Sequence, residues 1–195
     1  TLENPEVPKS AAVPSFDDII GKWYEDVVKK SVEMGIFKGV SGDKFAPETP
    51  ITRGMTATIL GRFANAPETA EASIFKDVDN SAYYAPFVTW CNKNGIVKGI
   101  SSDKFAPDDN VTREQIATIV GRYIESKGKT LEASKNKFVD DAKISDYAKN
   151  YVYALVNAGI LKGDDTNNFR PADNLTRAEA AAIIVRANEY LNAAK

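Results

Sequence analysis

An arginine recurs three times at a position where it could hold an anion. Each copy follows a threonine that is expected to begin a helix, and each lies 14 residues after a glycine: Arg53, Arg113 and Arg177. The first turn of a helix carries free amides and a partial positive charge, and a guanidinium can grip a carboxylate with two hydrogen bonds. The pattern favours an anion site. The alternative is an ion pair with a neighbouring carboxylate, for instance Asp18, Asp77 or Asp140.

A Lys-Gly step stands before each arginine, at Lys38-Gly39, Lys98-Gly99 and Lys162-Gly163. The lysine could add positive charge to an anion site, or it could be an ordinary solvated side chain. The glycine suits a positive φ or a close approach by another group. A contact with ligand and a purely conformational role therefore both remain open for the glycine.

These residues belong to a unit of roughly 60 residues that occurs three times. Each unit opens with Phe-x-Asp, continues through an apolar helical pattern to Gly-Ile-x-x-Gly, and then gives Phe-x-Pro and Thr-Arg. The repeats span residues 16–65, 75–125 and 138–190, and the proline-containing residues 1–15 are expected to form a linker or arm. Three helix-loop-helix repeats predict a mostly all-α fold.

Capping residues mark the helix boundaries. The first helix of each repeat is expected to end at a C′ glycine: Gly35, Gly95 and Gly159. The second is expected to begin at a threonine N-cap: Thr52, Thr112 and Thr176. Gln115 and Glu179 complete capping boxes, which Met55 cannot do. The opening aspartates could cap the first helix or orient the arginine, and the pattern favours capping.

Composition disfavours several function classes. The net charge of −2 argues against a nucleic-acid binder, and no apolar run approaches the ~20 residues of a membrane span. The chain has no histidine, which excludes Ser-His-Asp and Cys-His nucleophiles and removes the commonest metal ligand. The single cysteine, Cys91, suits a buried apolar position. No cofactor, metal or catalytic site is predicted.

Together the motifs resemble the surface layer homology (SLH) domain, with its aromatic-x-Asp, Gly-Ile-x-x-Gly, Phe-x-Pro and Thr-Arg-Ala-Glu signatures. The last signature is intact at residues 176–179, and the resemblance covers three tandem copies over about residues 16–190. The resemblance implies a pseudo-threefold, three-pronged spindle around a central three-helix bundle, with ligand grooves between neighbouring prongs.

The resemblance also implies a function. SLH modules anchor larger proteins non-covalently at the surface of bacteria, mainly Gram-positive ones, by binding a secondary cell-wall polysaccharide. This polymer often carries pyruvate ketals on amino sugars such as N-acetylmannosamine, and a ketal carboxylate would suit the three arginines. An extracellular location in the cell wall or S-layer follows, without membrane insertion.

The same resemblance extends the predicted site. An aromatic residue lies 12 positions before the first glycine of each repeat and offers a face for sugar C–H groups, with a core or rim role as the alternative: Trp23, Tyr83 and Tyr147. Hydroxyls of the loops and polar residues of the second helices complete the set: Ser41, Ser101, Gln115 and Glu179.

The three copies differ at two points of this site. Asp164-Asp165 replaces the neutral loop residues of the other copies, and Met55 stands where the third copy has Glu179. Like charge beside an anion lowers affinity. We therefore predict unequal grooves, in which the third loop contributes to the weakest and the second helix of the first repeat contributes less. Loss of Arg113 is expected to cost more affinity than loss of Lys162.

Three other functions remain open. A helical-repeat adaptor for protein–protein interaction in a surface assembly explains the repeats but not the recurring arginine. A calcium site at residues 164–168 would have only part of the alternating ligand pattern. Carboxylates are plentiful enough for a glycoside hydrolase, but no isolated acid pair stands out in an apolar setting. We favour a binding module that is not an enzyme.

Overall fold

Helices form the regular structure of the chain. In the computed structural model, which describes residues 15–67, 69 and 71–193, there are six α-helices, two 3-10 helices and no strand. They are η1 (Asp17–Ile19), α1 (Glu25–Glu33), α2 (Arg53–Phe63), α3 (Ala85–Lys93), α4 (Arg113–Ser126), η2 (Asp141–Lys143), α5 (Asp146–Asn157) and α6 (Arg177–Asn192). The predicted mostly all-α class is confirmed. Residues 1–14 of the predicted arm lie outside the described residues, and no described helix has the length and apolar character of a membrane span.

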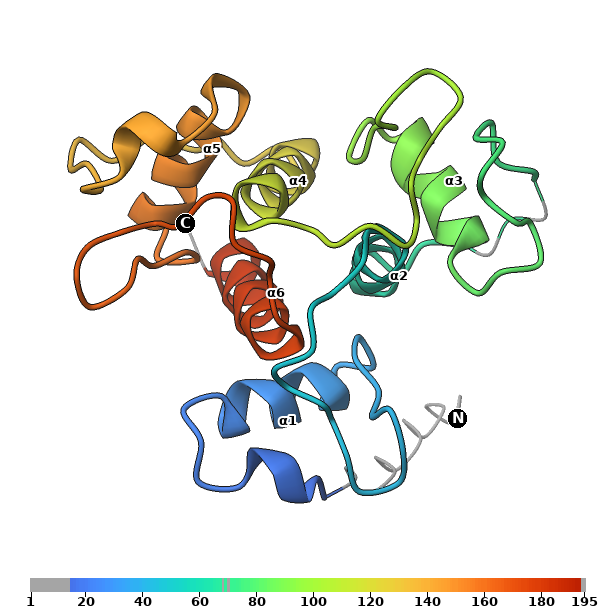
Figure 1. Cartoon of the computed structure of the whole chain (residues 1–195), viewed down its shortest axis with the longest axis horizontal. Coiled ribbons are helices and arrows are strands. Elements are labelled where there is room, and N and C mark those ends of the chain that lie inside the picture. Colours follow the sequence, from blue (N-terminus) through green and yellow to red (C-terminus); the bar gives the residue numbers. More distant parts are fainter. Residues whose placement is uncertain (1–14, 68, 70, 194–195) are drawn as a thin grey trace, which may run out of the picture.

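The helices that begin at the Thr-Arg pairs lie innermost. Figure 1 shows α2, α4 and α6 at the centre, with α1, α3 and α5 outside them. Each outer helix packs against an inner helix of another repeat: α1 against α6, α3 against α2, and α5 against α4. The first repeat is thereby packed against the third. The predicted pseudo-threefold symmetry of a spindle stays a prediction.

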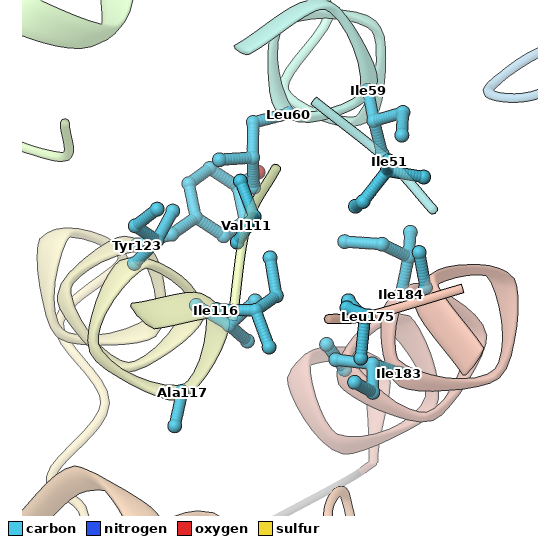
Figure 2. Packing of buried hydrophobic residues seen from close by; sticks show 14 of the residues in the cluster. Ile51, Ile59, Leu60, Val111, Ile116, Ala117, Tyr123, Leu175, Ile183 and Ile184 are labelled. Carbon is cyan, nitrogen blue, oxygen red and sulfur yellow. The ribbon is translucent and has the colours of Figure 1, made fainter. Parts of the chain in front are cut away.

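The segments that lead into the inner helices meet at the centre of the molecule. The amide of Ile51 donates to Leu175 O at 2.9 Å, that of Val111 to Ile51 O at 3.0 Å, and that of Leu175 to Val111 O at 2.9 Å. The three hydrogen bonds form a closed ring. Figure 2 shows these fully buried side chains among apolar residues of the inner helices, including Leu60 and Ile184.

The predicted caps are present. Each threonine N-cap accepts a hydrogen bond from the amide of the third helical residue, and full capping boxes form at α4 and α6 with Gln115 and Glu179. Gly35, Gly95 and Gly159 follow the outer helices with φ values of 72°, 69° and 73°. The phenylalanines of the three Phe-x-Pro motifs are fully buried. These features depend on residues close together in the chain.

The opening aspartates have a different role from the predicted one. The residues at the N-caps of α1, α3 and α5 make no side-chain capping hydrogen bond. Asp77 instead accepts from the amides of Phe105 at 2.8 Å and Ala106 at 2.7 Å. Asp18 and Asp140 bind the equivalent amides of the other two repeats. The prediction of helix capping was wrong because these loop amides, distant in sequence, are the closer donors.

Candidate functional site

The three recurring arginines are the first residues of the inner helices and are nearly buried. Arg53, Arg113 and Arg177 have exposed fractions of 9%, 7% and 6%. Burial lowers the pKa of each guanidinium, with nearby carboxylates opposing the shift. An arginine nevertheless keeps its charge in proteins. Such a charge must be satisfied by hydrogen bonds within the fold or by a ligand.

Two nitrogens of each arginine bind backbone carbonyls of another repeat. Arg177 Nε donates to Phe45 O at 2.9 Å, and Arg177 Nη2 donates to Lys38 O at 2.8 Å. Its guanidinium carbon also lies 4.6 Å from the centroid of the Phe45 ring. Arg53 binds Phe105 O and Lys98 O in the same way, and Arg113 binds Phe169 O and Lys162 O. The arginines therefore join repeats, which neither sequence alternative anticipated.

The amides at the start of each inner helix are not free, contrary to the prediction. In α6 the amides of Arg177 and Ala178 donate to Thr49 O and Pro47 O, each at 2.9 Å. The first two amides of α2 and α4 bind carbonyls in the same manner. The threonine N-cap takes the amide of the third residue. The helix termini thus offer no open anion site, and any charge for a ligand must come from side chains.

One cavity of about 160 Å³ gathers predicted site residues from all three repeats. Lys38 and Gly39 come from the first repeat, Tyr83 from the second and Arg177 from the third. Met55 and Arg62 of α2 also line it. We call this cavity the Arg177 groove. Its lining contains three basic residues and no acidic one.

A second cavity of about 430 Å³ has an equivalent lining, in which each kind of residue comes from the preceding repeat in cyclic order. Here the Lys-Gly step is Lys162-Gly163, the arginine is Arg113 and the aromatic residue is Trp23. Glu179 and Arg186 of α6, together with Asp165 and Arg170, also line it. We call this cavity the Arg113 groove. Arg113 and Lys162 both line this groove, and the expected larger loss of affinity on removal of Arg113 stays a prediction.

The remaining predicted residues form a third set. Arg53 is joined to Lys98, which precedes Gly99, by the hydrogen bond from Nη2. Tyr147 is about half exposed and donates to Glu114 Oε1 at 3.0 Å, and burial together with this bond raises its pKa to about 12. Gln115 accepts from the amide of Thr112. Ser41 and Ser101 line neither groove.

The Lys-Gly glycines are explained by a close approach. A Cβ on Gly39 would lie 2.5 Å from Cε1 of Phe16, and Gly99 and Gly163 face Phe75 and Phe138 in the same way. Their φ values are not positive, so close neighbours set the requirement: the ring of the opening phenylalanine in each repeat and, at Gly99, also the carbonyl oxygens of Ser101 and Lys104. Within the described part of the chain, the amides of these three glycines have no hydrogen-bond acceptor. They remain available to a ligand.

Sequence reasoning missed one pair of groove residues. Arg62 and Arg186 line the two grooves, where they also bind Ile36 O at 3.2 Å and Ile160 O at 3.4 Å. The signal was a second arginine nine residues after the first in every repeat. It could not be interpreted from sequence because the first arginine of a repeat does not lie in the same groove as the second.

The two grooves present the groups that a sugar-binding site uses. Trp23 and Tyr83 are 65% and 61% exposed, so each offers a ring face to solvent. Exposed lysines and partly exposed arginines supply charge, and unpaired glycine amides supply donors. No group of three His, Cys, Asp or Glu side chains that could hold a metal ion occurs among residues 15–67, 69 and 71–193.

Comparison with known proteins gives a family match. The model of the S-layer homology domain matches residues 15–54, 74–117 and 137–181. The chain is 34% identical over 172 residues to an exoglucanase XynX of Acetivibrio thermocellus, covering 87% of the chain and 16% of that protein. It is 32% identical over 192 residues to a surface-layer 125 kDa protein of Lysinibacillus sphaericus, covering 96% and 16%. A cellulosome-anchoring protein of Acetivibrio thermocellus is 31% identical over 156 residues, covering 78% and 35%.

The chain therefore spans only about a sixth to a third of these relatives. The family model, in contrast, matches more than half of the chain, and its three matches fall on the three repeats. This chain belongs to the S-layer homology domain family.

Proposed function

We propose that this chain is a non-catalytic module that holds a larger surface protein on an anionic secondary cell-wall polysaccharide. The family, with its surface-layer and cellulosome-anchoring relatives, supports anchoring at the cell surface and an extracellular location in the cell wall or S-layer. The relatives that are named as enzymes are much longer than the matched segment. Any catalytic activity is accordingly assigned to parts of such proteins that this chain does not match.

The observation that carries the proposal is the composition of the Arg177 groove. Lys38, Arg62 and Arg177 bring positive charge to one cavity, the exposed Tyr83 flanks it, and the amide of Gly39 has no acceptor within the described residues. A sugar that bears a carboxylate needs this combination of cation, donor and aromatic face. A pyruvate ketal would supply such a carboxylate, and we propose it as the recognised group.

Co-sedimentation with purified, protein-free cell walls tests this function. The chain should pellet with intact walls, and chemical removal of ketal pyruvate should reduce the bound fraction at least tenfold because the carboxylate is lost. Tyr83→Ala and Lys38→Ala should weaken binding, since both side chains line the groove and are exposed. Lys76→Ala is the matched control, because its side chain is 82% exposed and lines neither groove.

Two results would count against the proposal. Unchanged binding after ketal removal would refute the carboxylate as the recognised group while retaining an anchoring role. Failure to bind protein-free walls, with binding to a purified surface protein instead, would favour the helical adaptor.

A further inference from the structure

The Arg177 and Arg113 grooves differ in how completely their buried arginine is satisfied. Arg113 uses all three nitrogens within the protein: Nε and Nη2 bind carbonyls, and Nη1 forms an ion pair with Glu179 Oε1 at 2.9 Å. The side chains of this pair are 8% and 22% exposed. A partner so close and so shielded from water largely cancels the positive charge that a ligand would meet.

Among the residues that the structure describes, Arg177 has no such partner. Its Nε and Nη2 bind carbonyls as in Arg113, but Met55 occupies the position equivalent to Glu179. Within the described part of the chain, Arg177 Nη1 has no acceptor. Among the described side-chain nitrogen and oxygen atoms, only the Thr89 hydroxyl is both fully buried and without a partner. Because Arg177 Nη1 also has no partner, it is not fully buried. The groove that Arg177 lines gives access to it. A nearly buried guanidinium therefore presents one unused donor to the cavity.

The remaining lining residues reinforce this difference. The Arg177 groove adds Lys38 and Arg62 and contains no acid. The Arg113 groove also has Lys162 and Arg186, but it contains the acids Asp165 and Glu179, and its Arg170 is paired with Asp164 and Asp173, each at 3.4 Å. It is also the larger cavity and has the larger aromatic face, Trp23. Such a site suits an uncharged sugar that packs on the indole ring.

We propose that the third residue of the inner helix sets the ligand charge of each groove. With Met55 at this position, the Arg177 groove takes the carboxylate-bearing sugar. With Glu179, the Arg113 groove takes an uncharged sugar of the same polymer. This inference rests on the proposed function, since it assigns different parts of one polysaccharide to different grooves. It reverses the expectation from sequence that Met55 weakens its groove.

The test uses two probes and reciprocal substitutions. The probes are the methyl glycoside of an N-acetylated amino sugar with a pyruvate ketal, and the same glycoside without the ketal. Binding is followed in the whole chain by NMR shifts of the Gly39 and Gly163 amides, which report the Arg177 and Arg113 grooves. The substitutions are Met55→Glu, with Met55→Gln as its uncharged isosteric comparison, and Glu179→Gln.

The ketal probe should shift the Gly39 amide at a concentration at least tenfold below that needed for the Gly163 amide. Met55→Glu should bind this probe at least tenfold more weakly than Met55→Gln, because only glutamate can pair with Arg177. Glu179→Gln should strengthen binding of the ketal probe in the Arg113 groove. Glutamate and glutamine already occupy this position in the capping boxes of α6 and α4, so all three variants should fold, which thermal melting verifies.

Equal affinity of the ketal probe for the two grooves would overturn the inference, and so would agreement of Met55→Glu and Met55→Gln within twofold. If sedimentation with cell walls still depended on the ketal, either result would contradict only the assignment of ligands to the two grooves. The proposed function would still hold.

Discussion

At the scale of the residue, each Phe-x-Pro loop has an unfavourable backbone conformation that an aspartate stabilises. Ala46, Ala106 and Arg170 have φ values of 56°, 58° and 57°, in the left-handed region. This conformation costs a non-glycine residue about 1 kcal/mol or more, and a following proline restricts the residue further. In the second repeat, the two amide hydrogen bonds to Asp77 offset this cost. The loop in turn supplies the carbonyls that receive Arg53.

Asp77→Ala should therefore destabilise the protein by about 2 kcal/mol, because charge-assisted hydrogen bonds are lost and two amides are left unpaired. Chemical denaturation measures this change. Asp103→Ala is the control, since the contacts of Asp103 with Lys76 and the Ser101 hydroxyl lie at the surface and their loss should change stability much less.

The difference in stability between the unsubstituted protein and Asp77→Ala should depend on pH. Burial alone would raise the pKa of Asp77, but hydrogen bonds from the amides of Phe105 and Ala106 lower it below the ordinary value. The unfolded chain then binds the proton more readily, so the stabilisation is present above about pH 4 and is lost as the pH falls through the lower, folded value. The deficit of Asp77→Ala should shrink in that range. A deficit that stays constant down to pH 2 would show that the carboxylate charge is not involved.

At the scale of the element, two helix pairs meet through a glycine and an aromatic ring. A Cβ on Gly61 of α2 would lie 2.1 Å from Cδ1 of Phe87 on α3, and one on Gly121 of α4 would lie 2.2 Å from Cδ1 of Tyr151 on α5. In the third pair, α6 and α1, the equivalent positions hold Val185 and Val27. The exchange of a small and a large residue for two of intermediate size keeps the volume between the helices similar.

Gly121→Ala should accordingly destabilise the protein by about 1–3 kcal/mol through overpacking, although alanine alone favours a helix by about 1 kcal/mol over glycine. The double variant with Tyr151→Val should recover much of this loss, because a valine, as at Val27 in the pair of α1 and α6, then replaces the ring that the new methyl group would meet. Denaturation of both single variants and the double variant gives the coupling energy. A more stable Gly121→Ala protein would mean that α4 and α5 do not pack as closely as described.

At the scale of the whole molecule, the three repeats depend on one another. The backbone ring of Ile51, Val111 and Leu175 takes one residue from each repeat. Helix α1 packs on α6, where Lys30 also pairs with Glu189 at 2.5 Å. Because the outer helix of the first repeat is covered by the last helix of the third, no repeat retains its apolar contacts when separated from the others.

The chain should consequently unfold in one cooperative transition. Its two tryptophans lie in different repeats, Trp23 in the first and Trp90 in the second. The variants Trp23→Phe and Trp90→Phe each retain a single tryptophan. In each variant, the denaturation curve from tryptophan fluorescence should coincide with the curve for loss of helix from circular dichroism. If the transitions reported by the two tryptophans differed by more than the two variants differ in stability, the repeats would fold independently.

Much of the local structure was predictable from the sequence. The threonine N-caps, the two capping boxes and the C′ glycines all form as predicted. Each depends on residues a few positions apart, whose geometry is dictated by the helix itself. The role of the opening aspartates was not predictable, because their partners lie some 28 residues away across the loop.

The residue types of the candidate site could be named from the sequence, but their grouping could not. Two Lys-Gly steps, those of the first and third repeats, line two grooves together with an arginine and an aromatic residue from other repeats. The resemblance placed the grooves between neighbouring prongs without predicting which copies meet, whereas in the structure each groove takes its lysine, its aromatic residue and its buried arginine from three different repeats. Repetition along a chain reveals equivalent positions but contains no information on which copies become neighbours.

The sequence by itself determined the repeat, the helix boundaries and the types of residue at the candidate site, since these follow from spacing and local hydrogen bonding. Only the tertiary structure decided that α1 packs on α6, that the arginines join neighbouring repeats, and that Arg113 is paired with Glu179 while Arg177 Nη1 has no acceptor among the described residues. The physical reason is that a buried guanidinium is satisfied by whatever acceptors the packing brings within about 3 Å. That packing is a property of the closed set of three repeats.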